Sequence, residues 1–158
     1  NISVQENSGK EVQNAFMAGI MAHIKEITAF LNPTENSYER LGSRKAPKYV
    51  SWAHENRTQL IRVPSAINSH KRFEVRSPDP MANPYIAYSL LIYAGLDGIE
   101  KDMKLCEPIE MNLSTASPEI TSKLERLPES LREAVELAKN SEFVKKHLSA
   151  DFTSFFKV

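Results

Sequence analysis

Arginine and glutamate alternate in one short segment of the chain, Arg72-Phe73-Glu74-Val75-Arg76. Side chains of a β-strand point alternately to its two faces, so a strand here places Arg72, Glu74 and Arg76 on one face. The two apolar residues then pack into a core on the other face. A row of cation, carboxylate and cation is either a plain surface ladder or part of a site for a highly charged anion.

More arginines lie near this segment in the sequence. Residues 34–76 carry six Arg, three Lys and four Glu, a net charge of +5, within a chain whose formal net charge is zero. Arg57 and Arg62 bracket a neighbouring candidate strand, and Arg40 lies upstream. Converging guanidinium groups repel one another in an empty site and are favourable around a multiply charged anion. The pattern indicates a phosphoryl-transfer site in which Glu74 helps to bind magnesium or manganese, with solvated surface charge as the alternative.

Nucleic acid is the competing anion, and the sequence argues against it. Tyr49 and Trp52 accompany the arginines, but we find no helix-turn-helix pattern and no RNP-like aromatic motif. The five Gly residues are scattered, so a glycine-rich phosphate loop is absent. No uncharged run approaches the roughly 20 apolar residues of a membrane span. A single cysteine, Cys106, is expected to be inert and favours a reducing, cytoplasmic setting.

Helices and three short strands are expected to position these residues, in an α+β fold. Apolar residues recur every three or four positions over 12–31, which predicts an amphipathic helix that ends before Pro33. His23 lies beside this apolar stripe and is expected to be structural rather than a metal ligand. Strands are expected at 48–52, 59–63 and 72–76.

A second long helix is expected to begin at Pro84, with Asn83 as its N-cap. Residues 85–94 carry no charge, so this helix is expected to be buried on all sides and to stop at Gly95. The remaining segments are expected to be an irregular stretch at 100–127, helices at 128–140 and 141–148, and an apolar tail with Phe152, Phe155 and Phe156 that is cut short or packed against something else.

Five sequence blocks resemble the C-terminal catalytic region of type I glutamine synthetase. They are Asn32-Pro-Thr-Glu-Asn-Ser-Tyr-Glu-Arg40-Leu41, Asn56-Arg57 with Leu60-Ile-Arg62-Val-Pro64, Arg72-Phe-Glu74-Val-Arg76-Ser-Pro-Asp-Pro80, Ala82-Asn83-Pro84-Tyr85, and Ala94-Gly-Leu-Asp-Gly98. Their order and spacing are specific. The resemblance implies that residues 1–158 are a C-terminal portion of that catalytic domain, with short antiparallel strands flanked by helices, lacking the N-terminal domain and an upstream catalytic segment.

The same resemblance implies an ATP-dependent glutamate–ammonia ligase that forms glutamine through γ-glutamyl phosphate, with ATP and Mg²⁺ or Mn²⁺ as cofactors. It implies a homo-oligomeric double ring for the full-length protein. The 158-residue chain alone is expected to be inactive, because one carboxylate is too few for a two-metal site. The implied roles are glutamate binding by Arg40, Arg57 and Arg76, ATP binding by Arg57, Arg62 and Arg72, contact of Arg57 with the transferred phosphoryl group, and metal binding by Glu74.

Two positions depart from the family pattern. Before Ala46-Pro47 the family normally has a glutamate that deprotonates ammonium, and this chain has Lys45. A lysine cannot act as a carboxylate base and repels ammonium, which leaves open a catalytically impaired or altered-amine relative that retains nucleotide binding. Some members are adenylylated on a tyrosine after an Asn-Leu pair, where Ser114 stands here, so that control is expected to be missing.

Overall fold

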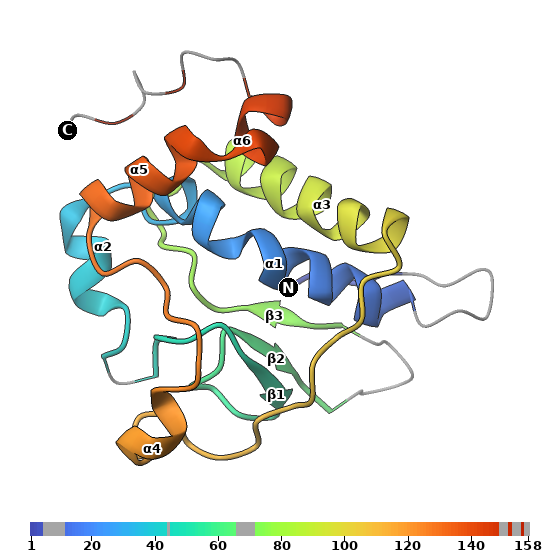
Figure 1. The fold of residues 1–158 in the computed structure, drawn as a ribbon, viewed down its shortest axis with the longest axis vertical. Coiled ribbons are helices and arrows are strands. Elements are labelled where there is room, and N and C mark those ends of the chain that lie inside the picture. Colours follow the sequence, from blue (N-terminus) through green and yellow to red (C-terminus); the bar gives the residue numbers. More distant parts are fainter. Residues whose placement is uncertain (5–11, 44, 66–71, 149–151, 153–155, 157–158) are drawn as a thin grey trace.

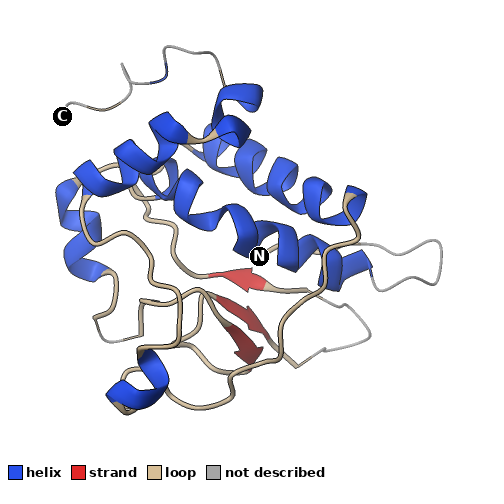
Figure 2. Ribbon diagram, viewed as in Figure 1, coloured by secondary structure: helices blue, strands red, loops and turns tan. Residues whose placement is uncertain are grey.

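Helices form a layer over a small three-stranded sheet in the computed structural model, which describes residues 1–4, 12–43, 45–65, 72–148, 152 and 156 (Figures 1 and 2). The elements are α1 (Val12–Leu31), α2 (Glu35–Arg40), β1 (Trp52–His54), β2 (Ile61–Val63), β3 (Glu74–Val75), α3 (Pro84–Glu100), α4 (Pro118–Thr121), α5 (Leu131–Asn140) and α6 (Glu142–His147). This arrangement confirms the α+β class.

Helix α1 lies at the centre of the fold and has the bounds that its apolar period predicts. It lies between α3 and the sheet in Figure 1, and its apolar stripe, which includes Ile20, Ile24 and Ile27, is fully buried. Towards the sheet, the ring of Phe16 lies 6.0 Å from that of Phe73. The helix therefore packs against the very strand segment that carries the alternating charges.

The sheet order is β1-β2-β3, and its pairing differs in part from the expected antiparallel strands. Strands β2 and β3 are antiparallel, with Arg62 opposite Glu74, but β1 and β2 are parallel, with Ala53 opposite Arg62. A three-residue strand is only about 10 Å long, so the six residues at 55–60 suffice to carry the chain back. The first strand also starts later than expected, because Tyr49 pairs with Arg126 in an isolated bridge.

Helix α3 begins as expected and then departs from the prediction. The Asn83 side chain accepts hydrogen bonds from the backbone N–H groups of Tyr85 and Ile86, which confirms the cap. The helix does not stop at Gly95 but continues to Glu100, and it is not buried all round. Its outer face is exposed, with the Tyr85 side chain 84% accessible. The absence of charged residues therefore does not by itself predict that a helix is buried, because burial depends on the elements that pack against it.

Glycines at the contact between α1 and α3 allow the two helices to pack closely, and Gly95 does not terminate α3. A Cβ atom on Gly98 would lie 2.1 Å from the carbonyl oxygen of Ala15 in α1, and one on Gly19 would lie 2.1 Å from the carbonyl oxygen of Ala94. Side chains at these positions are excluded because the two helix backbones are in contact. Gly95 likewise faces Phe16 in α1. The predicted helix stop was wrong for this reason.

Serine side chains cap both C-terminal helices, and α5 begins at Leu131, later than the expected start at 128. Ser130 and Ser141 each accept a hydrogen bond from a backbone N–H group in the first turn, at the starts of α5 and α6. In the tail, Phe152 and Phe156 are buried against Phe30, with ring centroids 5.4 and 5.1 Å away, so these two residues pack against α1. Phe155 lies outside the described residues.

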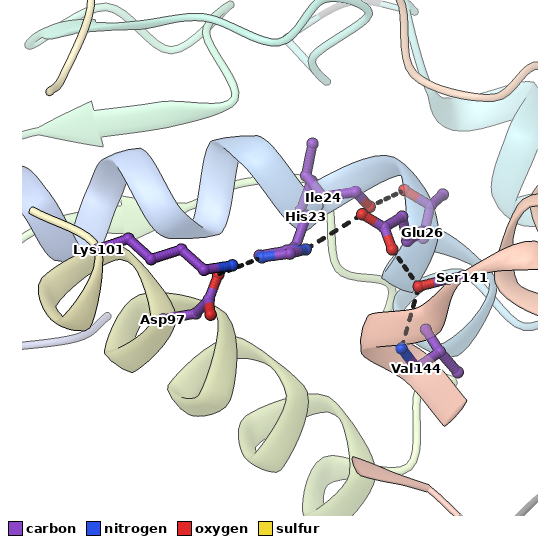
Figure 3. A network of polar contacts seen from close by, with 8 residues as sticks. His23, Ile24, Glu26, Asp97, Lys101, Ser141 and Val144 are labelled. Carbon is purple, nitrogen blue, oxygen red and sulfur yellow. Dashed lines mark hydrogen bonds and ion pairs between the residues drawn. The ribbon is translucent and has the colours of Figure 1, made fainter. Parts of the chain in front are cut away.

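A polar network centred on His23 joins α1 to α3 and to the start of α6 (Figure 3). The His23 ring lies 3.1 Å from Glu26 through Nδ1 and 2.8 Å from Asp97 through Nε2. Asp97 also binds Lys101, and Glu26 accepts a hydrogen bond from Ser141. Both ring nitrogens of His23 therefore contact carboxylates of the protein itself, which supports a structural role for His23. Within the described part of the chain, no helix combines the length and apolarity that a bilayer crossing needs.

Candidate active site

Glu74 lies between two guanidinium groups on one face of the sheet. Arg62 Nε donates to Glu74 Oε2 at 2.8 Å, and Arg76 donates to the same oxygen at 3.0 Å. On the opposite face Phe73 is fully buried. The prediction was that Arg72, Glu74 and Arg76 share one strand face and that Arg57 or Arg62 approaches them. The structure confirms it for Glu74, Arg76 and Arg62. We call Arg62, Glu74 and Arg76 the charged cluster.

The charged cluster keeps Glu74 ionised. Burial raises the pKa of Glu74, but the hydrogen bonds from Arg76 and Arg62 lower it by more, so the pKa lies below its ordinary value of 4.5. Both arginines donate to Oε2, and none of the described residues donates to Oε1. The side chain is 26% exposed, so a ligand can approach it from solvent.

Arg76 connects the charged cluster to two loops. Its Nε donates to the backbone carbonyl of Arg57 at 2.9 Å, and its second terminal nitrogen donates to the carbonyl of Lys45 at 3.3 Å. The side chains of Arg57 and Lys45 are themselves exposed. The structure thus places both loops at the rim of the charged cluster.

Two predicted arginines are not part of the charged cluster. Arg72 is half-buried, and it makes no ion pair with Glu74 among the residues that the structure describes. Arg40 donates to the side-chain oxygen of Asn32 at 3.2 Å and to the carbonyl of Ser77. Its Nε is 3.7 Å from Asp79. Among the described residues, Arg40 therefore contacts Asn32 and the segment that follows β3, and it does not contact Glu74.

Sequence reasoning missed the polar residues that fix the Arg57 loop. Asn56 precedes Arg57 and Gln59 lies two residues after it, and their side-chain amides donate to backbone carbonyls of residues 109–111, 50 to 55 residues away in the sequence. The available signal was Gln59 directly before the apolar pair Leu60-Ile61 of a strand candidate, since a buried amide requires partners.

A divalent metal would find only one of its ligands here. No group of three or more His, Cys, Asp or Glu residues in the described part of the chain has the arrangement of a metal centre. Oxygen is nevertheless the donor that Mg²⁺ and Mn²⁺ prefer, and Mg²⁺ commonly takes one or two carboxylates together with phosphate oxygens. Glu74, through Oε1, fits the part of a single protein ligand.

Comparisons with known proteins agree on one family. The family described as "Glutamine synthetase, catalytic domain" matches residues 2–158. The glutamine synthetase of Pyrococcus furiosus is 41% identical over 158 residues, which are 98% of this chain and 36% of that protein. The glutamine synthetase of Methanosarcina mazei is 39% identical over 144 residues, 89% of this chain and 32% of that protein. The chain therefore spans about one third of these relatives.

Solved structures give the same result for the fold. A structure described as a GmaS/ADP complex has a TM-score of 0.77 and 30% identity, and the similarity covers 97% of this chain and 36% of that one. A structure of GmaS without ligand has a TM-score of 0.75 at 30% identity. The fold and the charged cluster thus lie within a segment that matches throughout its length.

Proposed function

Because the chain belongs to the family of glutamine synthetase catalytic domains, we propose that it is one part of an ATP-dependent glutamate–ammonia ligase. In the proposed reaction the γ-carboxylate of glutamate attacks the terminal phosphorus of ATP, which forms γ-glutamyl phosphate and releases ADP. Ammonia then attacks the acyl carbon, gives up a proton and displaces phosphate, which leaves glutamine. The observation that carries the proposal is the charged cluster inside the matched segment.

Arg76 and Arg40 are the proposed ligands of the glutamate carboxylate. Guanidinium groups suit this role because their planar donors match a carboxylate in a bidentate pair. Arg40 donates to the carbonyl of Ser77, the residue after Arg76, so the two arginines contact consecutive residues of one segment. Both of the Arg40 hydrogen bonds to Asn32 and Ser77 use the same terminal nitrogen, and the proposal assigns the other terminal nitrogen to the substrate.

Arg62 and Arg72 are the proposed ligands of the ATP phosphates, and Arg57 faces the transferred phosphoryl group. Arg62 is held in place by Glu74, while the exposed side chain of Arg57 extends from a loop whose carbonyl is fixed by Arg76. Preorganised cations of this kind stabilise the charge that develops on a phosphoryl group. The similar GmaS structure with ADP supports nucleotide binding in this fold.

Glu74 is the proposed metal ligand of this chain, through Oε1. When bound, Mg²⁺ or Mn²⁺ supplies positive charge that neutralises the phosphates. Because one carboxylate cannot complete such a centre, the proposal assigns the remaining ligands to other parts of a longer enzyme. We place that enzyme in the cytoplasm as a homo-oligomer, with glutamate, ammonia and ATP as its substrates.

A relative with altered amine specificity is the second candidate, and Lys45 favours it. Its carbonyl lies 3.3 Å from an Arg76 nitrogen, so this lysine stands at the rim of the charged cluster. A cation at this rim disfavours binding of ammonium. Such a relative would still transfer a phosphoryl group from ATP to glutamate and would differ only in the amine that it accepts.

The test compares the full-length parent protein with the 158-residue chain. With ATP, glutamate, Mg²⁺ and ammonium, the parent is expected to form glutamine and ADP in equal amounts, and the chain alone is expected to form none. Replacing ammonium by small primary amines separates the two candidates. Glutamine formation by the isolated chain, or an absence of ATP-dependent amide formation by the parent with every amine, contradicts the proposal.

A further inference from the structure

The loop at 55–60, which carries Arg57, connects two parallel strands and has to reverse the chain twice within six residues. Glu55 at its start adopts a positive φ of 54°, in the left-handed region that few side chains favour. Such a loop needs external contacts to hold one conformation, because its own strands leave most of its backbone groups unpaired. One contact is already described: Arg76 binds the Arg57 carbonyl at 2.9 Å.

Gln59 ties this loop to a distant segment, residues 109–113, which we call the strap. The side chain of Gln59 is fully buried, and its Nε2 donates to the carbonyls of Ile109 at 2.7 Å and Met111 at 3.0 Å. Its Oε1 accepts a hydrogen bond from Ser51. In Figure 1 the chain that leaves α3 runs past β1 before it reaches α4, and the strap is part of this run. The amide nitrogen of Gln59 thus holds the loop on the strap, and its amide oxygen binds Ser51 just before β1.

Asn56 makes the same kind of contact on the other side of Arg57. Its Nδ2 donates to the carbonyls of Met111 at 2.7 Å and Glu110 at 3.1 Å. Its Oδ1 accepts from the backbone N–H group of Thr58 at 3.0 Å, which closes a turn around Arg57. Both residues that flank the exposed guanidinium are therefore anchored to the strap.

We propose that Gln59 and Asn56 are positioning residues for Arg57, and that the strap is the support against which they hold it. The inference rests on the proposed function, in which Arg57 faces the transferred phosphoryl group. A catalytic cation has to be held within fractions of an ångström of its productive position, and a loop achieves this only through supporting contacts. The exposed side chain of Arg57 is available to the phosphoryl group, whereas the buried side chain of Gln59 holds the loop in place.

The test uses the full-length parent with Gln59→Met, which keeps the volume and removes the amide, alone and combined with Arg57→Gln. We expect Gln59→Met to lower kcat for glutamine formation at least tenfold, with KM for ATP and glutamate changed less than twofold. In the Arg57→Gln background the same change should lower kcat less than twofold, because no guanidinium remains to be positioned. Equal losses in both backgrounds indicate a general structural role and overturn the inference.

Asn56→Ala should behave as Gln59→Met does, and Asn140→Ala provides its control. Asn140 is exposed at the end of α5, where its side chain binds Glu136 away from the strap, so its loss should leave kcat unchanged. Amide hydrogen exchange of residues 55–60 gives a readout that needs no turnover: Gln59→Met should speed it, and unchanged exchange overturns the inference. A wild-type parent that forms no amide product contradicts the proposed function instead, so the two failures are distinguishable.

Discussion

At the scale of single residues, the charged cluster is the part of the site that the sequence predicted best. Strict alternation put Glu74 and Arg76 on one strand face, and their shared hydrogen bond follows from it. The contact of Arg62 with Glu74 depends on the register between β2 and β3, which the local sequence does not determine. Arg40 shows the limit of this reasoning, because its partners Asn32 and Ser77 lie outside the strands that carry the charged cluster.

Lys45 gives a prediction at the same scale. In the full-length parent, Lys45→Glu should raise kcat/KM for ammonium at least tenfold, because it reverses the local charge by two units. At about 4 Å and an effective dielectric near 20, one unit interaction is worth a few kcal/mol, which allows this change after a large discount for solvent. The measurement is kcat/KM for ammonium at saturating ATP and fixed pH.

The control for this prediction is Lys123→Glu, because Lys123 is exposed in the turn after α4. It makes the same charge reversal away from the site and should leave kcat/KM unchanged. An active parent whose Lys45→Glu variant is unchanged or slower would show that this lysine does not occupy the base position.

At the scale of helices and strands, local patterns predicted α1 and the caps of α3 and α6 more reliably than how the elements pack. The period of α1 and the Asn83 and Ser141 caps are local chemistry, and the structure confirms them. The start of α5 was expected at 128, but the helix begins at Leu131 after the Ser130 cap. Gly95 was misassigned as a helix stop because the close approach of α1 and α3 is a tertiary property. The parallel β1–β2 pair was missed for the same reason.

Gly98 gives a prediction for the packing of these helices. Gly98→Ala should lower the free energy of unfolding by about 1 to 3 kcal/mol, because the new Cβ would lie 2.1 Å from the Ala15 carbonyl oxygen. The higher helix propensity of alanine, worth about 1 kcal/mol, offsets only part of this. Urea denaturation of the 158-residue chain measures the change. Ser89→Ala, at an exposed position of α3, is the control and should be near neutral, and equal stability of both variants would contradict the packing argument.

His23 gives a pH prediction at this scale. Burial lowers the pKa of His23, but its hydrogen bonds with Glu26 and Asp97 raise it by more, so the pKa lies above its ordinary 6.5. A raised pKa in the folded state means that protonation favours folding. This contribution is fully present below pH 6.5 and is lost as the pH rises through the raised pKa.

The free energy of unfolding of the wild-type chain should therefore fall from pH 6 to pH 9 by more than that of His23→Gln. Urea denaturation at a series of pH values measures the difference. His54→Gln is the control, since His54 is exposed on β1 and bound to Glu110 rather than to the helix layer. Parallel pH profiles for wild type and His23→Gln would show that the network of Figure 3 does not couple protonation to folding.

At the scale of the whole molecule, the family resemblance supplied the function and the structure supplied the geometry. Charge and alternation indicated an anion site for a phosphoryl group, but only the resemblance of the ordered blocks from residue 32 to residue 98 suggested glutamate and ammonia as the substrates of the proposed enzyme. The chain spans about one third of its relatives, and among its described residues Glu74 alone contacts both arginines of the charged cluster, while Glu55 lies 3.7 Å from Arg62. The proposal therefore assigns the remaining metal ligands to other parts of a longer enzyme.

The most direct test measures ATP-dependent glutamine formation by the full-length parent and its Arg76→Gln variant. Arg76 contacts Glu74 and both rim loops, so its loss should lower kcat/KM for glutamate on the order of a hundredfold, about 2.7 kcal/mol of transition-state stabilisation. Arg132→Gln, an exposed arginine on α5, should leave the rate unchanged. If Arg76→Gln forms glutamine as fast as the wild type, the charged cluster is not the glutamate site and the central claim is contradicted.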